Sequence, residues 1–469
     1  MKLGVITLGC DKNTVDSERV LAQLAHYGAE HTDDLGKADV IIVNTCGFID
    51  AAKRESIDAL VDAGRRKDDG ACQTLVAFGC MVERHKQELA SELPEVDIFL
   101  GASEMDRLVP ALAERGVLRE PSSRHPGVRL YTGDLPHVRY LKISEGCDHG
   151  CAFCAIPLMR GKHRSFPLDE IVREAQILEF QGAREVNLVA QDLAHYGRDR
   201  GDGVRLPELL EALVADTGVP WIRMLYVYST GLTPRLLEVM AREPRVLPYL
   251  DMPIQHGSDA VLERMRRPER ASTIRERVIR VREAVPDVAI RTTCIVGFPG
   301  ETEEDFSRLL DLLEETRFER VGAFTYSAQE GTRAAKLPDD VPDELKHERL
   351  ERLTDLQRSI TAEQYERHIG RTVEAIVDHE AEKFADGNGT AQARTVWQAD
   401  DVDGLTYLSG HATVGSIVEA RIDDVVDDYD FAASVVRVLD SRPEAISQHE
   451  RAGRSLPVMS GISGGSYGR

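Results

Sequence analysis

One stretch decides the fold and the chemistry: Cys147-Asp148-His149-Gly150-Cys151-Ala152-Phe153-Cys154. Its C-x3-C-x2-C spacing directly follows a short apolar segment that is typical of a buried strand. Three thiolates on one tight loop can bind three irons of a cubic 4Fe-4S cluster and leave the fourth iron open to another ligand. A zinc loop is the alternative, with His149 or His163 as a further ligand. The spacing favours the cluster, and we call Cys147, Cys151 and Cys154 the loop cysteines.

Around this loop, apolar segments alternate with segments of helical spacing. The predicted strands are Tyr140–Ser144, Val186–Ala190, Ile222–Tyr228, Tyr249–Ile254, Ile290–Val296 and Val321–Tyr326. The predicted helices include Leu168–Gln181, Leu206–Thr217, Pro234–Glu243 and Glu303–Thr316, and a charged helix, Pro342–His368, follows the series. Six βα units predict a partial (βα)6 barrel of the TIM type, closed less completely than the eight-fold barrel.

The N-terminal part predicts a separate α/β unit. Its short segments rich in branched apolar residues are Leu3–Leu8, Val40–Asn44, Leu75–Phe78 and Val96–Leu100. Helical spacing at Ser17–Tyr27 and Ala51–Arg65 separates them. The pattern indicates a small doubly wound α/β domain.

A second set of cysteines follows these strands. Cys10, Cys46 and Cys80 each come just after one strand, at intervals of 36 and 34 residues. Ligands of open α/β sheets bind outside the carboxyl ends of the strands, so these three thiols should converge on a second cluster. Each could instead be a small buried apolar side chain, as free cysteines often are. We call the three the N-terminal cysteines, and we assign no chemistry to Cys72 and Cys294.

The C-terminal part changes to short strands with turns between them. The predicted strands are Val373–Val377, Leu405–Leu408, Ser416–Arg421 and Ala432–Val438, with turns at Asp386-Gly387-Asn388-Gly389 and Asp403-Gly404. This pattern predicts a small β-barrel. We therefore divide the chain into domains at residues 1–117, 133–364 and 367–439, and we expect residues 440–469 to be a disordered tail.

Composition limits the partners and the compartment. The 469 residues are 42% hydrophobic and 29% charged, which is ordinary for a globular protein. A formal net charge of −22 disfavours binding to a phosphate backbone. The apolar start of the chain is too short for a signal peptide or a membrane span, so we expect a cytoplasmic protein whose eight cysteines are thiols or metal ligands.

These motifs resemble a known family. The loop cysteines with Phe153 resemble the radical S-adenosylmethionine superfamily. The three-cysteine N-terminal domain, and a final barrel that looks like a TRAM domain, narrow the resemblance to the methylthiotransferases. One branch of that family modifies a tRNA adenosine, and the other, the RimO type, modifies an aspartate of a ribosomal protein. Four stretches resemble the RimO type: Leu8–Glu18, Tyr140–Cys147, Ile156–Gly161 and Tyr249–His256.

The resemblance implies a reaction and its cofactors, two 4Fe-4S clusters and S-adenosylmethionine. The cluster on the loop cysteines, the catalytic set, would reduce S-adenosylmethionine to a 5′-deoxyadenosyl radical. That radical would take hydrogen from the β-carbon of an aspartate of small-subunit ribosomal protein twelve. The cluster on the N-terminal cysteines would carry sulfur, methylated by a second S-adenosylmethionine, to the carbon radical. A reductant protein such as flavodoxin or ferredoxin is implied, with no membrane partner and with nucleic acid met only indirectly through the ribosome.

Other strand ends are candidates for binding S-adenosylmethionine. Gln191 and Asp192 end the second strand of the partial barrel, and Gln255 and Ser258 follow the fourth. Gly297 and Pro299 belong to a turn, Gly297-Phe298-Pro299-Gly300-Glu301, that follows the fifth strand and brings backbone groups near an adenine. The alternative is that each is an ordinary turn or a solvated strand end.

Charge favours one branch over the other. Residues 366–438 contain 15 Asp and Glu against 6 Lys and Arg. A barrel that binds tRNA should carry a basic face, whereas an acidic barrel complements a basic ribosomal protein. The acidic residues could instead be only a solvated face. Two rival functions stay open: a tRNA methylthiotransferase with a basic surface elsewhere, and an iron-sulfur electron-transfer or scaffold protein without radical chemistry.

The chain departs from the family pattern at three places, one of which is the barrel segment Ala391–Asp403, which only loosely follows the RimO-type pattern. Asp11 stands where the family usually has proline. The Ser-Arg-Pro that follows the cluster loop in the family appears here as Arg164-Ser165-Phe166-Pro167. These departures concern contacts to the substrate and leave the two cysteine sets unchanged.

Overall fold

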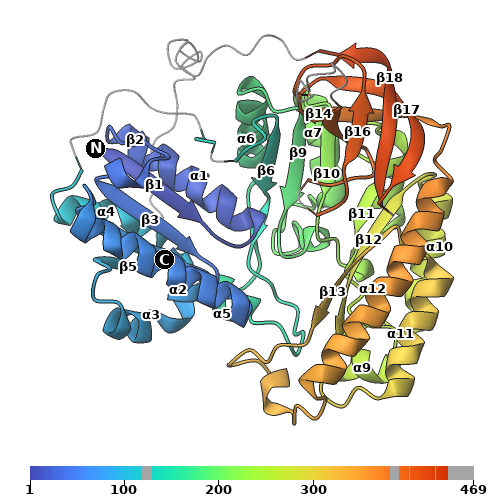
Figure 1. The fold of residues 1–469 in the computed structure, drawn as a ribbon, viewed down its shortest axis with the longest axis horizontal. Helices are drawn as coiled ribbons and strands as arrows, with labels where there is room; N and C mark the ends of the chain where they lie inside the picture. The colour runs from blue at the N-terminus through green and yellow to red at the C-terminus, as the bar shows by residue number, and fades with distance from the viewer. Residues whose placement is uncertain (119–128, 132, 381–389, 401, 428, 442–469) are drawn as a thin grey trace.

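The computed structural model describes residues 1–118, 129–131, 133–380, 390–400, 402–427 and 429–441 (Figure 1). The predicted turn at Asp386-Gly387-Asn388-Gly389 and residues 442–469 of the predicted tail lie outside the described residues. No helix in the described ranges is long and apolar enough to cross a membrane.

The N-terminal unit is a parallel sheet with helices on both faces. Its five strands have the order β2-β1-β3-β4-β5. They are β1 (Lys2–Thr7), β2 (Glu30–His31), β3 (Val40–Thr45), β4 (Thr74–Gly79) and β5 (Ile98–Gly101). The helices are α1 (Asp11–His26), η1 (Leu35–Lys37), α2 (Asp50–Asp69), α3 (Cys80–Glu92), η2 (Ala102–Arg107) and α4 (Leu108–Glu114). Every residue of β3 and β4 is buried, as both faces of a doubly wound sheet require.

The central unit is a partial barrel of two three-stranded parallel sheets, with the orders β10-β9-β6 and β11-β12-β13. The strands are β6 (Val138–Lys142), β9 (Glu185–Val189), β10 (Trp221–Met224), β11 (Tyr249–Asp251), β12 (Ala289–Val296) and β13 (Arg320–Thr325). The larger helices are α6 (Leu168–Phe180), α7 (Leu206–Asp216), α8 (Pro234–Arg242), α10 (Ala271–Ala284), α11 (Glu303–Thr316) and α12 (Asp343–Glu366). Helices α10, α11 and α12 lie side by side outside the second sheet (Figure 1). The predicted fold class is confirmed.

Short elements connect the strand ends of this unit. They are β7 (Ser144–Glu145), α5 (Ile156–Arg160), β8 (Arg164–Ser165), η3 (Leu193–His195), η4 (Ser229–Gly231), α9 (Asp259–Arg264) and η5 (Ala334–Lys336). The loop cysteines lie between β7 and α5. The short elements therefore surround the carboxyl ends of the strands, where a barrel of this kind binds its ligands.

Two predicted strands are too long. The expected strand Ile222–Tyr228 ends at Met224, because Tyr226 adopts a φ of +67° and donates its backbone N–H to the Asp251 carboxylate over 3.2 Å. The expected strand Tyr249–Ile254 likewise ends at Asp251. Beyond these points regular pairing stops and only single backbone hydrogen bonds, such as those of Gln255 to β12, hold the chain at the rim of the partial barrel.

The C-terminal unit is a closed five-stranded barrel with the order β14-β15-β16-β18-β17. Its strands are β14 (Thr372–His379), β15 (Ala391–Thr395), β16 (Thr406–Ser409), β17 (Ile417–Val426) and β18 (Asp430–Asp440). β15 was not predicted, because its sequence AQART contains a buried arginine, Arg394, that pairs with Glu185 of β9 over 2.7 Å. This ion pair fixes the barrel against the central unit.

Candidate functional site

The loop cysteines lie on a turn that hydrogen bonds hold on both sides. The backbone N–H of Cys147 donates to the Gly161 carbonyl over 3.1 Å, and that of Ala152 donates to Met265 over 2.8 Å. Gly146 has a φ of +78°, and a Cβ there would lie 2.1 Å from the Lys162 carbonyl oxygen. Only glycine therefore lets the chain enter the loop this closely.

The half-buried loop thiols would ionise most readily when a positively charged metal is bound to them. Burial raises the pKa of Cys147 to about 11 and that of Cys154 to about 12, and the neighbouring Cys151 adds to both shifts. Because the thiolate is the form that binds metal, a bound metal must supply the positive charge that ionises them. The three clustered sulfurs fit an iron-sulfur cluster.

The two histidines considered as zinc ligands are engaged elsewhere. His149 Nε2 lies 2.7 Å from Asp192, and His163 Nε2 lies 3.0 Å from the Ser165 hydroxyl. Each imidazole would have to leave its partner, or offer its other nitrogen, to act as a fourth ligand. These contacts disfavour the zinc alternative.

The N-terminal cysteines meet at the carboxyl edge of the first sheet. Cys10 precedes α1, Cys46 follows β3 and Cys80 opens α3, and the strands before them are adjacent in the order β1-β3-β4. Gly9 has a φ of +92°, and a Cβ there would lie 2.8 Å from the Cys46 sulfur. Burial raises the pKa of Cys80 to about 11, and Cys10 and Cys46 also act to raise it. The three thiols thus lie within electrostatic reach of one another and also fit a cluster.

A buried charge network lies between the two cysteine sets. Arg160, at the end of α5, donates to Asp16 of α1 over 2.6 Å, to Glu145 over 3.2 Å and to the Cys80 sulfur over 3.1 Å. Lys142 pairs with the same two carboxylates. Although burial acts to raise it, the pKa of Asp16 is lowered to about 2 by Lys142 and Arg160. Both acids are therefore ionised in the folded protein at neutral pH.

Gln191 and Asp192 lie beside the loop cysteines. The Gln191 amide donates to Glu145 over 3.1 Å. One oxygen of Asp192 accepts the backbone N–H groups of Ala194 and Tyr228, over 2.9 and 3.1 Å, and the other faces His149. Both predicted residues therefore reach the rim of this site.

The other predicted contacts are distributed around the same rim. Gln255, with a φ of +71°, joins β12 through backbone hydrogen bonds to Thr293 and Ile295. The buried Ser258 hydroxyl donates to Asp305 over 2.5 Å, which already explains its polarity. Gly297 and Pro299 flank Phe298, which packs in one apolar cluster with Ala152 of the cysteine loop. The structure therefore brings the 297–300 turn to the loop and gives Ser258 a structural partner.

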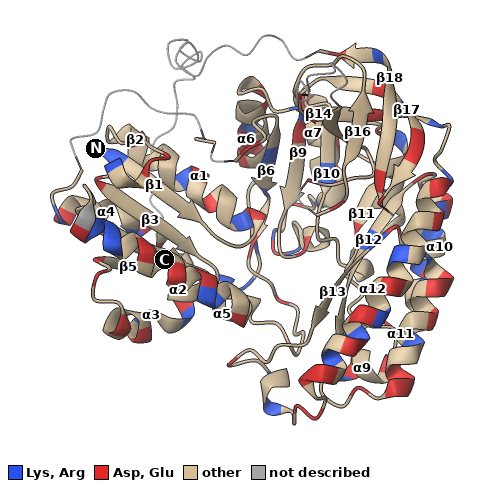
Figure 2. Cartoon of the chain, in the orientation of Figure 1, with Lys and Arg blue, Asp and Glu red and all other residues tan. Residues whose placement is uncertain are grey.

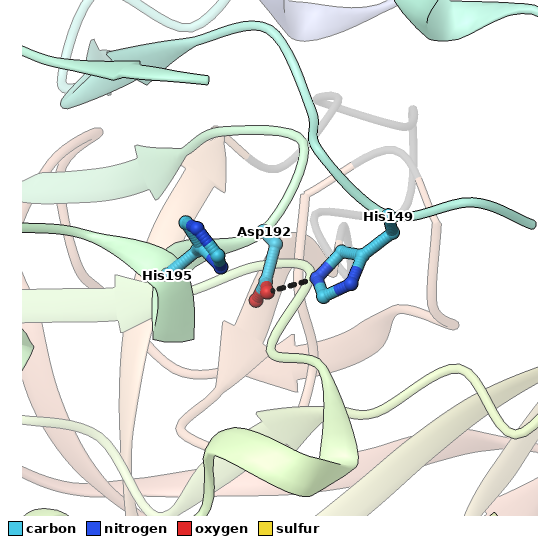
Figure 3. A group of neighbouring side chains, drawn as sticks. All are labelled: His149, Asp192 and His195. Carbon is cyan, nitrogen blue, oxygen red and sulfur yellow. Dashed lines mark hydrogen bonds and ion pairs between the residues drawn. The ribbon is translucent and has the colours of Figure 1, made fainter. Parts of the chain in front are cut away.

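His149, Asp192 and His195 form a compact polar group beside the loop (Figure 3). Their ligand atoms lie within 4.8 Å of one another, a spacing that suits a divalent cation. His149 also stacks on Tyr228 with 4.0 Å between ring centroids, and burial lowers the pKa of His195. The hydrogen bond to Asp192 and the stacking on Tyr228 account for His149 as a wall of the site, whereas Nδ1 of His195 is buried without a hydrogen-bond partner in the described ranges.

Sequence reasoning missed several residues that contact the loop. Tyr228 places its hydroxyl 3.9 Å from the Cys151 sulfur, and Arg267 places Nη1 at 3.8 Å from it. Arg267 also stacks over the Tyr228 ring, 3.8 Å from its centroid. Its position as the last residue of the predicted strand Ile222–Tyr228 was the one signal for Tyr228. Nothing in the local sequence indicated Arg267.

Comparison with known families covers all three units. Residues 2–101 match Uncharacterized protein family UPF0004, residues 141–313 match the Radical SAM superfamily, and residues 369–436 match the TRAM domain. A protein of Anaeromyxobacter sp. (strain K) named ribosomal protein uS12 methylthiotransferase RimO is 45% identical over 458 residues, covering 96% of this chain and 95% of that protein. The chain belongs to the RimO family of radical S-adenosylmethionine methylthiotransferases.

Other members and a solved structure agree with this assignment. The RimO protein of Geobacter sulfurreducens is 44% identical over 451 residues, covering 93% of this chain and 98% of its own. Among solved structures, the radical S-adenosylmethionine methyltransferase TsrM from Kitasatospora setae aligns with a TM-score of 0.51 at 14% identity, covering 69% of this chain and 72% of that one. That likeness supports the fold. The resemblance found in the sequence to the RimO family is confirmed.

Proposed function

We propose that this RimO-family chain inserts a methylthio group at the β-carbon of an aspartate of ribosomal protein uS12. Support comes first from relatives of 42–45% identity over nearly the whole chain that carry this name. The structural observation that carries the proposal is the proximity of two three-cysteine sites, with Arg160 reaching from the end of α5 to the sulfur of Cys80. An iron-sulfur electron-transfer or scaffold protein without radical chemistry would leave an open iron beside the second site unexplained.

The loop cysteines would hold one 4Fe-4S cluster and the N-terminal cysteines a second. When bound, these clusters and S-adenosylmethionine supply the radical and the sulfur of the reaction. The chain's own residues position them. Gly146 admits the tight loop, Tyr228 and Arg267 cover Cys151, and Gly9 admits close approach of Cys46. Covering side chains keep water from the reacting groups.

We assign the binding of S-adenosylmethionine to the rim around the loop cysteines. Gln191 and Asp192 are supported by their links to Glu145 and His149. Gly297 and Pro299 are supported by the packing of Phe298 against the loop. Gln255, whose backbone has a left-handed φ, would contact S-adenosylmethionine with its side chain. The Ser258 hydroxyl donates to Asp305, so Ser258 would help to position the neighbouring residues of the cofactor site.

The C-terminal barrel would contact the protein substrate. Asp423, Asp424 and Asp427 are exposed at and just beyond the end of β17, and the red segments of that strand in Figure 2 mark its Asp and Glu positions. Asp430 of the same run instead accepts the backbone N–H of Leu405 over 2.7 Å. An exposed acidic edge complements a basic ribosomal protein. The proposal also includes domain limits at residues 1–117, 133–364 and 367–439. It further includes a flavodoxin or ferredoxin as the reductant and action in the cytoplasm.

The mass of uS12 tests the proposed function. We expect uS12 from cells that carry the gene to show one methylthio group on an aspartate, and uS12 from cells without it to lack that group. An unchanged uS12 mass, together with loss of a methylthio group from a tRNA adenosine, would assign the chain to the other branch of the family.

A further inference from the structure

Among the residues that the structure describes, one buried cation lacks a carboxylate partner. Nine lysine and arginine side chains are buried in the described ranges, and eight of them lie within 4.0 Å of a carboxylate. Arg129, Lys142 and Arg394 are examples, paired with Glu18, Asp16 and Asp378. Lys12, only 7% exposed, forms no hydrogen bond or ion pair with any residue that the structure describes. A buried charge without a partner is costly, so its retention calls for a ligand that supplies the opposite charge.

The position of Lys12 indicates which ligand this is. Lys12 is the second residue of α1 and follows Cys10 by two positions. Its ammonium lies 3.7 Å from the centroid of the Tyr226 ring, a cation–π contact that leaves its hydrogen-bond donors unused. Two residues beyond Tyr226, the Tyr228 hydroxyl lies 3.9 Å from the Cys151 sulfur. Lys12 thus follows a cysteine of the N-terminal set in the chain and contacts the segment whose Tyr228 reaches the loop cysteines.

We propose that Lys12 binds the side-chain carboxylate of the substrate aspartate. The proposal rests on the proposed function, because it takes the substrate to be an aspartate modified between the two cysteine sites. An ammonium on a flexible stem can donate to a carboxylate from one side while the Tyr226 ring holds it from another. The ion pair between Lys12 and the substrate carboxylate would orient the aspartate and leave its β-carbon accessible to the 5′-deoxyadenosyl radical. It would also distinguish aspartate from asparagine.

Three other charges near Lys12 do not satisfy it. Cys10 and Asp11 act on the ammonium electrostatically, and neither forms an ion pair with it in the described ranges. Asp251, which holds the backbone of Tyr226, pairs instead with Arg291 over 3.2 Å. Since no residue in the described ranges supplies Lys12 with a carboxylate, we consider two sources, the substrate and the amino-acid group of S-adenosylmethionine. The test separates these two sources.

A double-mutant cycle tests the pair directly. Affinity for uS12 is measured with the cluster-loaded enzyme and no reductant, using natural uS12 and uS12 with the modified aspartate changed to asparagine. We expect Lys12→Met to weaken binding of natural uS12 about tenfold or more, the value of one charge-assisted hydrogen bond. Lys12→Met and the wild type should bind the asparagine form equally. Lys12→Arg should recover part of the loss.

Controls make the result specific. Lys37→Met removes an exposed lysine of the same unit, paired with Asp34, and should leave both affinities unchanged. Iron content and the absorption spectrum of Lys12→Met should match the wild type. Affinity for S-adenosylmethionine should also stay unchanged.

Each contrary result has one meaning. An equal loss for both uS12 forms overturns the proposal and gives Lys12 a structural or charge-balancing role. A loss of affinity for S-adenosylmethionine alone overturns it in favour of the cofactor's carboxylate. Failure of the wild-type enzyme to bind either uS12 form rejects the proposed function itself, and the Lys12 pair with it.

Discussion

Arg160 donates a hydrogen bond from Nε to the sulfur of Cys80 over 3.1 Å, although the two residues are 80 positions apart. Arg160 ends α5, the helix that directly follows the loop cysteines, whereas Cys80 opens α3 of the N-terminal unit. The same guanidinium pairs with Asp16 of α1 over 2.6 Å. One side chain thus fixes the position of the N-terminal cysteines relative to the loop cysteines.

Replacement of Arg160 should change the N-terminal cluster. A donor to a ligand sulfur raises the reduction potential of a cluster, so Arg160→Met should make this potential more negative and Arg160→Lys should change it less. The measurement is a redox titration followed by electron paramagnetic resonance, in a background with all three loop cysteines changed to alanine. Since Asp16 and Glu145 would keep only Lys142, the free energy of unfolding should also fall by about 3 kcal/mol.

Arg19→Met is the matched control for this experiment. Arg19, on α1, pairs with Glu174 of α6 over 2.8 Å and so also joins the two units. Within the described ranges it contacts no cysteine sulfur. Arg19→Met should leave the reduction potential of the N-terminal cluster unchanged. If Arg160→Met also leaves the potential unchanged, the role of Arg160 is confined to holding the units together.

The sequence predicted the strands best where burial on both faces leaves only apolar residues. β3 and β4 are such strands, and their predicted ends differ from the observed ones by a single residue. Because these strand ends were predicted well, the N-terminal cysteines could be placed at one sheet edge from the sequence alone. Their role as cluster ligands remains a prediction.

Polar residues whose partners are distant in sequence could not be predicted. Arg394 is buried in β15 because Glu185, more than 200 positions earlier, neutralises it. Arg160 and Lys142 meet Asp16 only where α1 packs against β6 and α5. No local pattern contains these partners, and the end of β10 was misplaced for the same reason, since Asp251 holds Tyr226 from another strand.

The two cysteine sets should separate two activities. Cys151→Ala removes a ligand at the loop, so we expect it to abolish cleavage of S-adenosylmethionine to 5′-deoxyadenosine. Cys46→Ala should spare that cleavage and abolish methylthio insertion. Both are measured anaerobically by chromatography of 5′-deoxyadenosine and by the mass of uS12.

Cys72→Ala is the control for both variants. Cys72 is buried in the N-terminal unit, and its sulfur donates to the Thr74 carbonyl over 3.5 Å. It should retain both activities. Equal cleavage by the wild type and Cys151→Ala would show that the loop is not the site of this reaction.

His368 should make the protein sensitive to mild acid. Burial, with Arg371 and Arg367 acting in the same direction, lowers the pKa of His368 to about 4 from an ordinary 6.5. Between these values the unfolded chain binds a proton that the folded protein does not, so stability falls as the pH drops from 6.5 toward 4. His368→Phe keeps a ring against Trp397, whose centroid lies 4.0 Å away, and removes the titration. The Tm of His368→Phe minus the Tm of the wild type should therefore be larger at pH 5 than at pH 7.

The control for this effect is His411→Phe, because His411 is exposed in the same C-terminal unit. Thermal unfolding of the metal-free, reduced chain at both pH values gives the comparison. An unchanged difference in Tm between the wild type and His368→Phe would contradict the assignment of the acid sensitivity to His368.

Glu185 should hold the C-terminal barrel on the central unit. Its fully buried carboxylate accepts from Arg223 over 2.7 Å and pairs with Arg394 of the barrel over 2.7 Å. Glu185→Gln leaves two buried guanidinium groups short of one negative charge, so the free energy of unfolding should fall by about 3–5 kcal/mol. Proteolysis between the units should also accelerate.

Glu419→Gln, which breaks the exposed Arg437–Glu419 pair within the barrel, should lower the free energy of unfolding by at most about 1 kcal/mol. Equal losses in the two variants, measured by denaturant unfolding, would mean that Glu185 contributes no more than a surface charge.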